Sequence, residues 1–269
     1  MSTTDAAHNE AALGFIGFGN MAQAMARGLI ESHTCSGSRI TACAAHFDKL
    51  QKNAAALGVQ PAQTAAEVVE ASDLVILAVK PYQVAQVVES VRDALANKIV
   101  ISVAAGCDFD FYETILASGT HHLSTIPNTP IAVGHGVIAC ENRHSLTEDE
   151  YALFTGIFGQ IALIEPVDTK LLSTASSVAG CGPAFAAMFL EALSDAGVKH
   201  GLPRATAYRL ASQMMLGTAA LQLATGEHPG AMKDAVCSPG GTTIKGVAAL
   251  EKGGFRSSII SAVDATKGE

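Results

Sequence analysis

The stretch GFIGFGNMAQAM, residues 14–25, decides the fold of this chain. Within it, Gly17, Gly19 and Ala22 stand in the order G-x-G-x-x-A, after a β-forming run and at the start of a helical pattern. In such a turn the first glycine permits a tight bend, the second lets the backbone approach a diphosphate, and the alanine lets helix and strand pack closely. The stretch therefore predicts a strand, a dinucleotide-binding turn and a helix.

The end of the second predicted strand bears on which dinucleotide would bind. It reads ACAAH over residues 42–46. Sites specific for NAD usually carry an acidic residue here, about 20 residues after the glycines, to bind the ribose 2′-hydroxyl. This chain has no acid there, and His46 and Lys49 can offer positive charge to a 2′-phosphate, although each also fits a solvated helix start. We therefore expect NADPH as the cofactor, with NADH possible.

Short β-rich runs alternate with helical patterns through the first part of the chain. We expect strands at residues 13–17, 39–44, 74–79, 99–103, 122–126, 133–140 and 161–165. Helical patterns lie between several of them, at residues 21–31, 47–57, 82–95 and 110–117, and Thr147 with Glu150 fits a capping box that opens another helix. This order predicts a mostly parallel sheet with helices on both faces, a doubly wound Rossmann-type α/β domain.

After Pro166 the strand signals stop and only helical patterns follow. Asp168 can cap a helix that runs to about residue 178, and further helices are expected at residues 182–199 and 204–224, with proline near the starts and glycine near the ends. We therefore divide the chain into a dinucleotide-binding domain, residues 1–164, and an all-α domain, residues 165–269.

The helices of the second domain are apolar on nearly every side. Residues 183–190 read PAFAAMFL, and residues 214–223 are almost as apolar. A helix that is apolar all round must be buried all round, and a domain of this size can hardly bury that much alone. We expect a homo-oligomer built on these helices. The alternative is that they pack wholly against the first domain.

The composition argues against several other classes of function. The formal net charge is −8 with no basic run, which argues against nucleic acid or an anionic membrane surface as a partner. The longest apolar run, residues 183–190, is too short to span a bilayer, and residues 1–10 show no secretory signal. Six cysteines without a CxxC pair and nine histidines without metal-ligand spacing predict reduced thiols and no metal site. The expected location is the cytoplasm.

Two further loops leave the same edge of the predicted sheet, and they read AVKP over residues 78–81 and IPNTP over residues 126–130. Ligands in open α/β sheets bind outside the carboxyl ends of the strands, so both loops are placed to meet the cofactor. With no nucleophile elbow and no G-x-x-x-x-G-K-[ST] loop, hydride transfer is the expected chemistry. The residues expected to bind the cofactor are Gly17, Phe18, Gly19, Asn20, Met21, His46, Ala78, Val79, Lys80, Pro81, Asn128 and Thr129.

The most unusual stretch of the second domain is CSPGGTTIKG, residues 237–246. Gly240 and Gly241 would expose backbone N–H groups ahead of a helix that begins near Thr242, and Ser238 adds a hydroxyl. A small carboxylate fits such a site without an arginine, because helix N-terminal amides and the helix dipole favour an anion. Ser238 and Thr242 also fit ordinary helix N-caps.

Read in order, the strings GFIGFGNMA, AVKP, IPNTP, GCGPAF and CSPGGTTI resemble pyrroline-5-carboxylate reductases. Each string is weak alone, but five in this order and spacing are highly specific, and the resemblance covers residues 13–266. It implies an N-terminal Rossmann domain, a C-terminal helical dimerisation domain, and dimers that often assemble into rings.

The resemblance also implies an activity: reduction of the C=N bond of L-1-pyrroline-5-carboxylate to L-proline with NADPH or NADH, the last step of proline synthesis. The implied substrate-binding residues are Ser238, Gly240, Gly241, Thr242 and Thr243. Thr243 would be the catalytic residue and hydrogen-bond the ring nitrogen. Hydride would reach C5 of a protonated imine from a nicotinamide near residues 128–130, with proximity as the main source of rate.

Some positions depart from the family pattern. Ala44, Ala45 and His46 stand where relatives often carry Ser or Asn with a basic residue, and Ala65 where many have Asn. Two alternatives stay open: an NADP(H)-binding regulator without turnover, and a reductase of a related cyclic imine. An F420-linked dehydrogenase or a β-hydroxyacid dehydrogenase would share the architecture, but the latter needs a lysine base that residues 183–195 lack.

Overall fold

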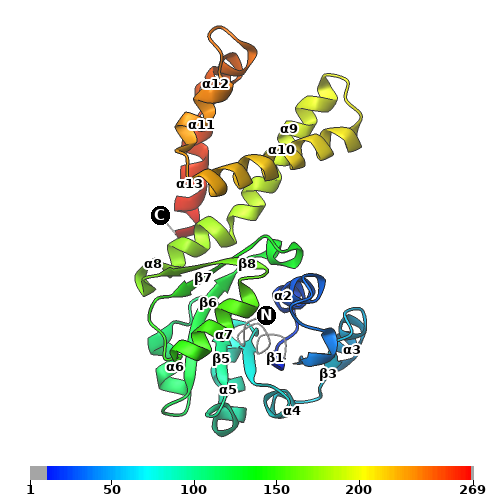
Figure 1. The fold of residues 1–269 in the computed structure, drawn as a ribbon, viewed down its shortest axis with the longest axis vertical. Helices are drawn as coiled ribbons and strands as arrows, with labels where there is room; N and C mark the ends of the chain where they lie inside the picture. Colours follow the sequence, from blue (N-terminus) through cyan, green and yellow to red (C-terminus); the bar gives the residue numbers. More distant parts are fainter. Residues whose placement is uncertain (1–10, 268–269) are drawn as a thin grey trace. The chain divides into compact units, whose positions relative to one another are not determined.

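The hydrophobic runs in the first part of the chain form one eight-stranded sheet (Figure 1). The computed structural model describes residues 11–267; residues 1–10, where the sequence predicts no secretory signal, lie outside the described part. The strands are β1 Leu13–Ile16, β2 Ile40–Cys43, β3 Gln60–Pro61, β4 Leu74–Leu77, β5 Ile99–Ser102, β6 His121–Pro127, β7 Gly136–Glu141 and β8 Ala162–Val167. Their order is β3-β2-β1-β4-β5-β6-β7-β8, and only β6 and β7 pair antiparallel. The predicted doubly wound, mostly parallel sheet is confirmed.

Helices cover both faces of this sheet. They are α2 Asn20–Glu31, α3 Phe47–Ala55, α4 Ala65–Glu70, α5 Pro81–Leu95, α6 Phe109–Ile115 and α7 Glu148–Phe158, with short 3-10 turns η1 Gly37–Arg39 and η2 Thr129–Val133. The start of α7 confirms the capping box, because the Thr147 hydroxyl accepts from the Glu150 amide at 3.3 Å and the Glu150 carboxylate accepts from the Thr147 amide at 2.8 Å.

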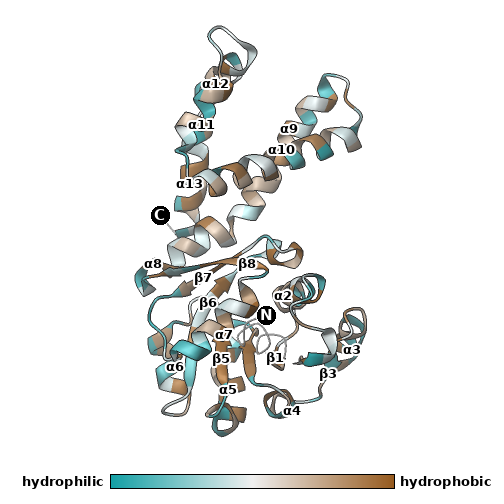
Figure 2. Cartoon of the chain, viewed as in Figure 1, coloured by the Kyte–Doolittle hydropathy of each residue, from teal (hydrophilic) through white to brown (hydrophobic). Residues whose placement is uncertain are grey.

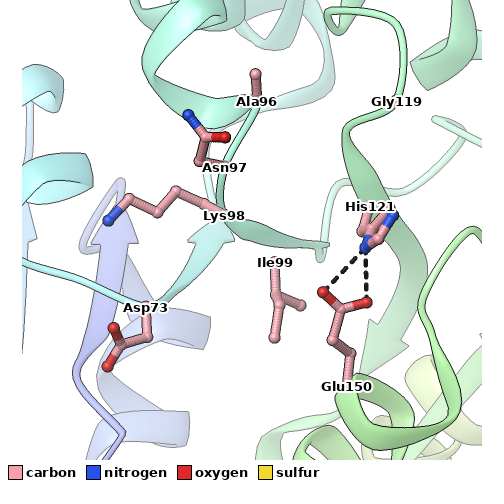
Figure 3. A pocket seen from close by; sticks show the side chains of 8 residues that line it. All are labelled: Asp73, Ala96, Asn97, Lys98, Ile99, Gly119, His121 and Glu150. Atoms are coloured by element: carbon pink, nitrogen blue, oxygen red, sulfur yellow. Dashed lines mark hydrogen bonds and ion pairs between the residues drawn. The ribbon is translucent and has the colours of Figure 1, made fainter.

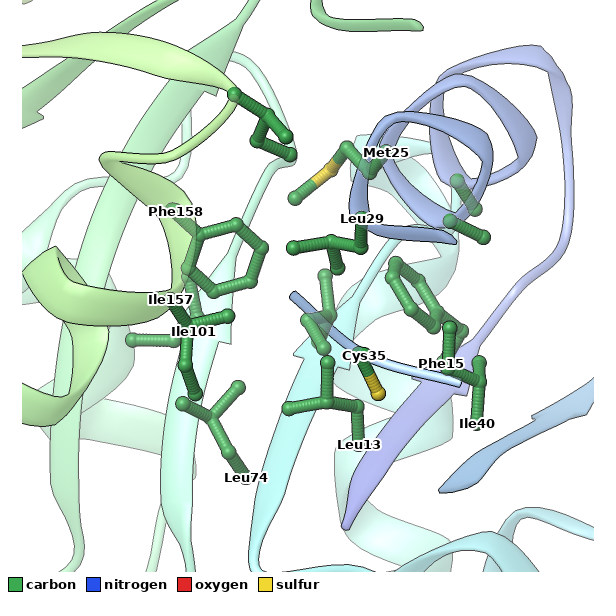
Figure 4. Close-up of a cluster of buried hydrophobic side chains, with 14 of the residues drawn as sticks. Leu13, Phe15, Met25, Leu29, Cys35, Ile40, Leu74, Ile101, Ile157 and Phe158 are labelled. Carbon is green, nitrogen blue, oxygen red and sulfur yellow. The ribbon is translucent and has the colours of Figure 1, made fainter. Parts of the chain in front are cut away.

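The two faces hold separate hydrophobic cores. In β4, Leu74 and Ile76 join a cluster with α2 and α7, while Val75 and Leu77 join a cluster with α4, α5 and α6. Figure 4 shows Met25 and Leu29 of α2 packed with Phe158 on the first face. Successive strand residues point to opposite faces, so a strand covered on both sides must be apolar throughout. This explains the uninterrupted run LVIL in β4.

Several bounds differ from the predicted ones. The strand expected over residues 133–140 begins only at Gly136, because η2 occupies residues up to Val133 and Gly134 turns the chain with φ +74°. The short elements β3 and α4 lie outside the predicted elements, since two and six residues are too few to show a clear period.

The chain divides into two compact units, Met1–Gly180 and Cys181–Glu269. The expected boundary after residue 164 falls inside β8, which pairs along its whole length with β7, and α8 Thr169–Ala175 also packs on these strands. Asp168 precedes α8, but its side chain accepts a hydrogen bond from Asn142 at 2.6 Å and does not cap the helix. A π-helical turn, η3 Ser176–Gly180, then ends the first unit.

The second unit is entirely helical over its described residues, as predicted. It comprises α9 Gly182–Lys199, α10 Arg204–Thr225, α11 Pro229–Val236, α12 Thr242–Lys252 and α13 Phe255–Lys267. Apolar residues recur along these helices (Figure 2). Large apolar side chains are exposed on the unit, including Met188 at 69% and Leu223 at 73%. Such a surface indicates a partner, because soluble monomers rarely expose extended apolar patches.

One helical stretch also meets the length and composition expected of a membrane span. Residues 183–190 are too short for this, but α8, η3 and α9 run continuously over Thr169–Lys199, and only 6% of the most apolar window is buried. A single such helix is weak evidence for a membrane, since a helix that packs in a subunit interface has the same composition.

Candidate active site

The turn after β1 has the geometry that the sequence predicts for it. Gly17 adopts φ +96°, a conformation that favours glycine, and its amide donates to the Cys43 carbonyl at 2.9 Å. A Cβ at this position would lie 2.6 Å from the Ala78 carbonyl oxygen. The loops after β1, β2 and β4 therefore meet closely at one edge of the sheet.

A cleft of about 860 Å³ opens at this edge, at the carboxyl ends of the parallel strands. Its volume lies within the range of roughly 300–1,000 Å³ typical of small-molecule and cofactor sites. Most residues expected to bind the cofactor line it: Gly17, Gly19, Asn20, Met21, Ala78, Val79, Lys80, Pro81 and Thr129.

The start of α2 suits an anion in this cleft. Gly19 is the N-cap, no side chain caps it among the described residues, and the first intrahelical bond runs from the Gln23 amide to the Gly19 carbonyl at 3.0 Å. The amides of Asn20, Met21 and Ala22 thus have no acceptor within the helix. A Cβ on Gly19 would have no neighbour within 4 Å. Free amides, the helix dipole and open space fit a dinucleotide diphosphate.

The loop CSPGGTTIKG forms a tight turn that leads into α12. The Gly241 amide donates to the Ser238 carbonyl at 3.0 Å, Gly240 adopts φ +67°, and Gly241 is the N-cap of α12. A Cβ on Gly241 would collide with the Ser238 hydroxyl oxygen. Ser238, Thr242 and Thr243 are exposed on the second unit. The turn thus presents backbone amides and hydroxyls together at a helix N-terminus.

A second, polar pocket of about 450 Å³ lies at the opposite, amino-terminal ends of β5 and β6 (Figure 3). Its charged side chains already make hydrogen bonds or ion pairs with other groups of the protein. The Lys98 ammonium donates to the Ser72 carbonyl at 2.6 Å, the Asp73 carboxylate accepts from the Ala12 amide at 2.9 Å, and His121 Nδ1 lies 2.7 Å from Glu150 Oε2. This pocket is a structural feature, and no group of metal-binding side chains occurs there or elsewhere in residues 11–267.

Two family models match this chain. Residues 169–269 match the pyrroline-5-carboxylate reductase dimerisation model, and residues 12–106 match the model for F420-dependent NADP oxidoreductases. A pyrroline-5-carboxylate reductase of Treponema pallidum is 44% identical over 257 residues, which cover 94% of this chain and 97% of the relative. The chain belongs to the pyrroline-5-carboxylate reductase family.

Other members of the reductase family match over similar lengths. The enzyme of Arabidopsis thaliana is 40% identical, with 93% of this chain and 91% of the relative covered. Among solved structures, a pyrroline-5-carboxylate reductase of Coxiella burnetii has a TM-score of 0.83 and 31% identity, with 96% of both chains covered. The Plasmodium falciparum enzyme, solved with NADP bound, has a TM-score of 0.85 and 27% identity, also with 96% of both chains covered.

Three of the residues expected to bind cofactor do not line the cleft of this reductase. The Phe18 side chain is 4% exposed and lies in the hydrophobic core, 6.1 Å between ring centroids from Phe15. His46 is the exposed N-cap residue of α3. Asn128 is buried, and both ends of its side-chain amide bind backbone groups of Val137 and Ala179.

The cleft also contains residues that sequence reasoning missed. Val103, Ala104 and Ala105 follow β5, and Gln63 precedes α4. The three residues after β5 could have been predicted, because residues that follow a buried parallel strand lie at the edge of the sheet where ligands bind. Nothing in the local sequence marks Gln63, whose place depends on how β3 and α4 fold back toward β2.

Proposed function

We propose that this protein reduces L-1-pyrroline-5-carboxylate to L-proline with NADPH, the final step of proline biosynthesis. The observation that carries the proposal is the combination, in a member of the reductase family, of a dinucleotide-sized cleft and an intact SPGGTT turn. The name of the family describes this reaction.

The cofactor site follows from the cleft. The amides at the start of α2 hold the diphosphate, and the AVKP loop and Thr129 contact the rest of the dinucleotide. Lys80 is exposed and supplies a positive charge to an otherwise acidic protein. The absence of an acid at residues 42–46 favours NADPH, and NADH remains the second choice. When bound, the reduced dinucleotide supplies the hydride.

The substrate carboxylate binds the SPGGTT turn. Gly240 and Thr242 offer backbone amides and Ser238 offers a hydroxyl, whereas the Gly241 amide, expected from the sequence to be exposed, is taken up by the Ser238 carbonyl within the turn. The dipole of the 11-residue helix α12 favours the negative charge. Thr243 orients the ring nitrogen through its hydroxyl. No general acid is required if the imine enters protonated, so the protein contributes mainly position.

The chain self-associates through its C-terminal helices, as the match to the dimerisation model indicates. The exposed apolar side chains of α9 and α10 supply the surface for this contact. Assembly of dimers into a larger ring and a cytoplasmic location are further parts of the proposal.

The test is the loss of NADPH absorbance with purified protein and pyrroline-5-carboxylate, in the parent, in Thr243→Ala and in Thr266→Ala. Thr266 is a matched control because its hydroxyl donates to the Val263 carbonyl of its own helix, at 2.7 Å. We expect turnover in the parent and in Thr266→Ala, and a loss of about tenfold to a hundredfold in Thr243→Ala.

Two outcomes would redirect the proposal. NADPH binding without turnover of any cyclic imine would favour a regulator. A six-membered cyclic imine has one more methylene than pyrroline-5-carboxylate, and a pocket discriminates against one methylene by only about 1–3 kcal/mol. Faster turnover of such an imine would therefore favour a related cyclic imine as the substrate.

A further inference from the structure

Asn128 is the most extensively bonded residue of the IPNTP loop. It follows Pro127, the last residue of β6, and is 6% exposed. Its amide N–H donates to the Val137 carbonyl at 3.1 Å, and its Oδ1 accepts from the Val137 amide at 2.8 Å. Its Nδ2 donates to the Ala179 carbonyl at 2.9 Å. The side chain therefore joins two backbone segments that lie 42 residues apart, at Val137 and Ala179 (179 − 137).

The Ala179 carbonyl belongs to an irregular part of the helix that leaves the sheet. Ser176–Gly180 is a π-helical turn between α8 and α9, and it packs on β6 and β7. Single π turns inside helices are rare and occur often at functional sites. This turn ends at Gly180, the last residue of the first unit.

The residue next to Asn128 faces the cleft. Thr129 lines the cofactor cleft and begins η2, which packs against α2. Fixing Asn128 at both ends of its amide therefore fixes the backbone from which Thr129 projects. A side chain makes both bonds only if it carries a donor and an acceptor in one planar group at the same distance from the backbone. A carboxylate or a methyl group therefore cannot replace the Asn128 amide.

We propose that Asn128 is a positioning residue that holds Thr129 in the cofactor cleft and locks the π turn at the exit of the first unit. The inference deepens the proposed function and rests on it for the identity of the cofactor. Asn128 acts through backbone groups and does not itself contact the cofactor with its amide.

The first test compares Asn128→Asp and Asn128→Ala with the exposed control Asn97→Asp. The aspartate variant keeps the acceptor for the Val137 amide but places an oxygen against the Ala179 carbonyl, whereas alanine removes both bonds. We expect NADPH binding, measured by direct titration, to weaken about tenfold in both variants near pH 8 and to stay unchanged in Asn97→Asp. The KM for pyrroline-5-carboxylate should change less than the dissociation constant for NADPH.

A pH series separates positioning from general damage. The pKa of the carboxyl introduced by Asn128→Asp is raised by burial and by the facing carbonyl, and its protonated form can again donate to Ala179. NADPH binding by Asn128→Asp should recover as the pH falls, while Asn128→Ala should not. Titratable side chains of the parent also lie on the elements near Asn128. On β6 and β7 they include His121, His122 and Glu141, at the far ends of these strands, and His135 precedes β7. The turns η2 and η3 carry no titratable side chain.

Hydrogen exchange tests whether Asn128 holds the π turn in place, and it needs no assay of turnover. The amides of residues 176–180 should exchange faster in both variants than in the parent near pH 8. NADPH, added near the dissociation constant of the parent, should slow this exchange most in the parent. If Asn128→Asp binds NADPH like the parent at every pH and protects residues 176–180 equally, the inference is wrong. A parent that binds NADPH but does not reduce the imine would overturn the reaction and leave this inference standing.

Discussion

The carbonyl oxygen of Ile131 occupies the place that a side chain on Gly28 would need. Gly28 lies in α2, the helix that begins at the dinucleotide turn, and Ile131 lies in η2, the turn that carries Thr129. The missing side chain lets the two backbones touch. This contact brings together two segments about a hundred residues apart in sequence, which both border the cofactor cleft.

Gly28→Ala should therefore damage cofactor binding from outside the cleft. The added methyl group must push η2 away from α2, which costs about 1–3 kcal/mol of unfolding free energy, and NADPH affinity should fall with it. Denaturant unfolding and NADPH titration measure the two effects. Arg27→Ala changes an exposed neighbour on the same helix and is the control. Parent-like stability in Gly28→Ala would mean that η2 is not held by this contact.

Gly19→Ala should separate binding from folding. A Cβ at Gly19 has no neighbour within 4 Å, and the residue has φ −78°, which any amino acid adopts. The unfolding free energy should change by no more than about 1 kcal/mol, the usual scale of an N-cap exchange. The methyl group would nevertheless project where the diphosphate approaches, so the NADPH dissociation constant should rise at least about tenfold. Unchanged affinity would place the diphosphate elsewhere.

The SPGGTT turn, the proposed site for the substrate carboxylate, should tolerate asparagine better than a branched residue at Gly240. Its φ of +67° is a left-handed conformation that asparagine adopts at small cost and valine at large cost. We expect Gly240→Asn to keep most of the reductase activity and Gly240→Val to raise the KM for pyrroline-5-carboxylate about tenfold or more. NADPH binding is the internal reference and should not change. Equal KM values in the two variants would argue against a role for this turn geometry.

The hydrogen-bonded pair His121 and Glu150 should make the free energy of unfolding depend on pH in the acidic range. Burial alone would raise the pKa of Glu150, but hydrogen bonds from His121 and Thr147 outweigh it and lower the pKa below the ordinary value of 4.5. A lowered pKa in the folded state stabilises the protein above the ordinary value, and this contribution disappears as the pH falls through the lowered pKa.

The unfolding free energies of the parent and Glu150→Gln should therefore differ most above pH 4.5, the ordinary pKa of the carboxyl, and converge as the pH falls through its lowered pKa. Glu148→Gln, in the same first turn of α7, is the matched control and should show no such convergence beyond a small dipole effect. A pH-independent difference for Glu150→Gln would show that the carboxylate charge contributes nothing.

The sequence by itself determined the class of the fold and the local structure of two short segments. The G-x-G-x-x-A turn forms as predicted because Gly17 supplies the positive φ that the bend needs, and Gly19 leaves the N-cap of α2 without a side chain. The LVIL run of β4 is buried on both faces because alternation in a strand leaves no other arrangement for it. Local stereochemistry and hydrophobic period are properties that a sequence carries directly.

Only the tertiary structure decided the roles of side chains whose partners are distant in sequence. Phe18 stands inside the dinucleotide turn, yet its ring enters the core, and Asn128 stands in a cleft loop, yet its amide binds Val137 and Ala179. The end of the first unit lies at Gly180 because β8 and α8 stay on the sheet, which no composition change marks. These outcomes depend on which backbone groups remain unpaired once the sheet and its helices have packed, and that is not encoded in any single segment.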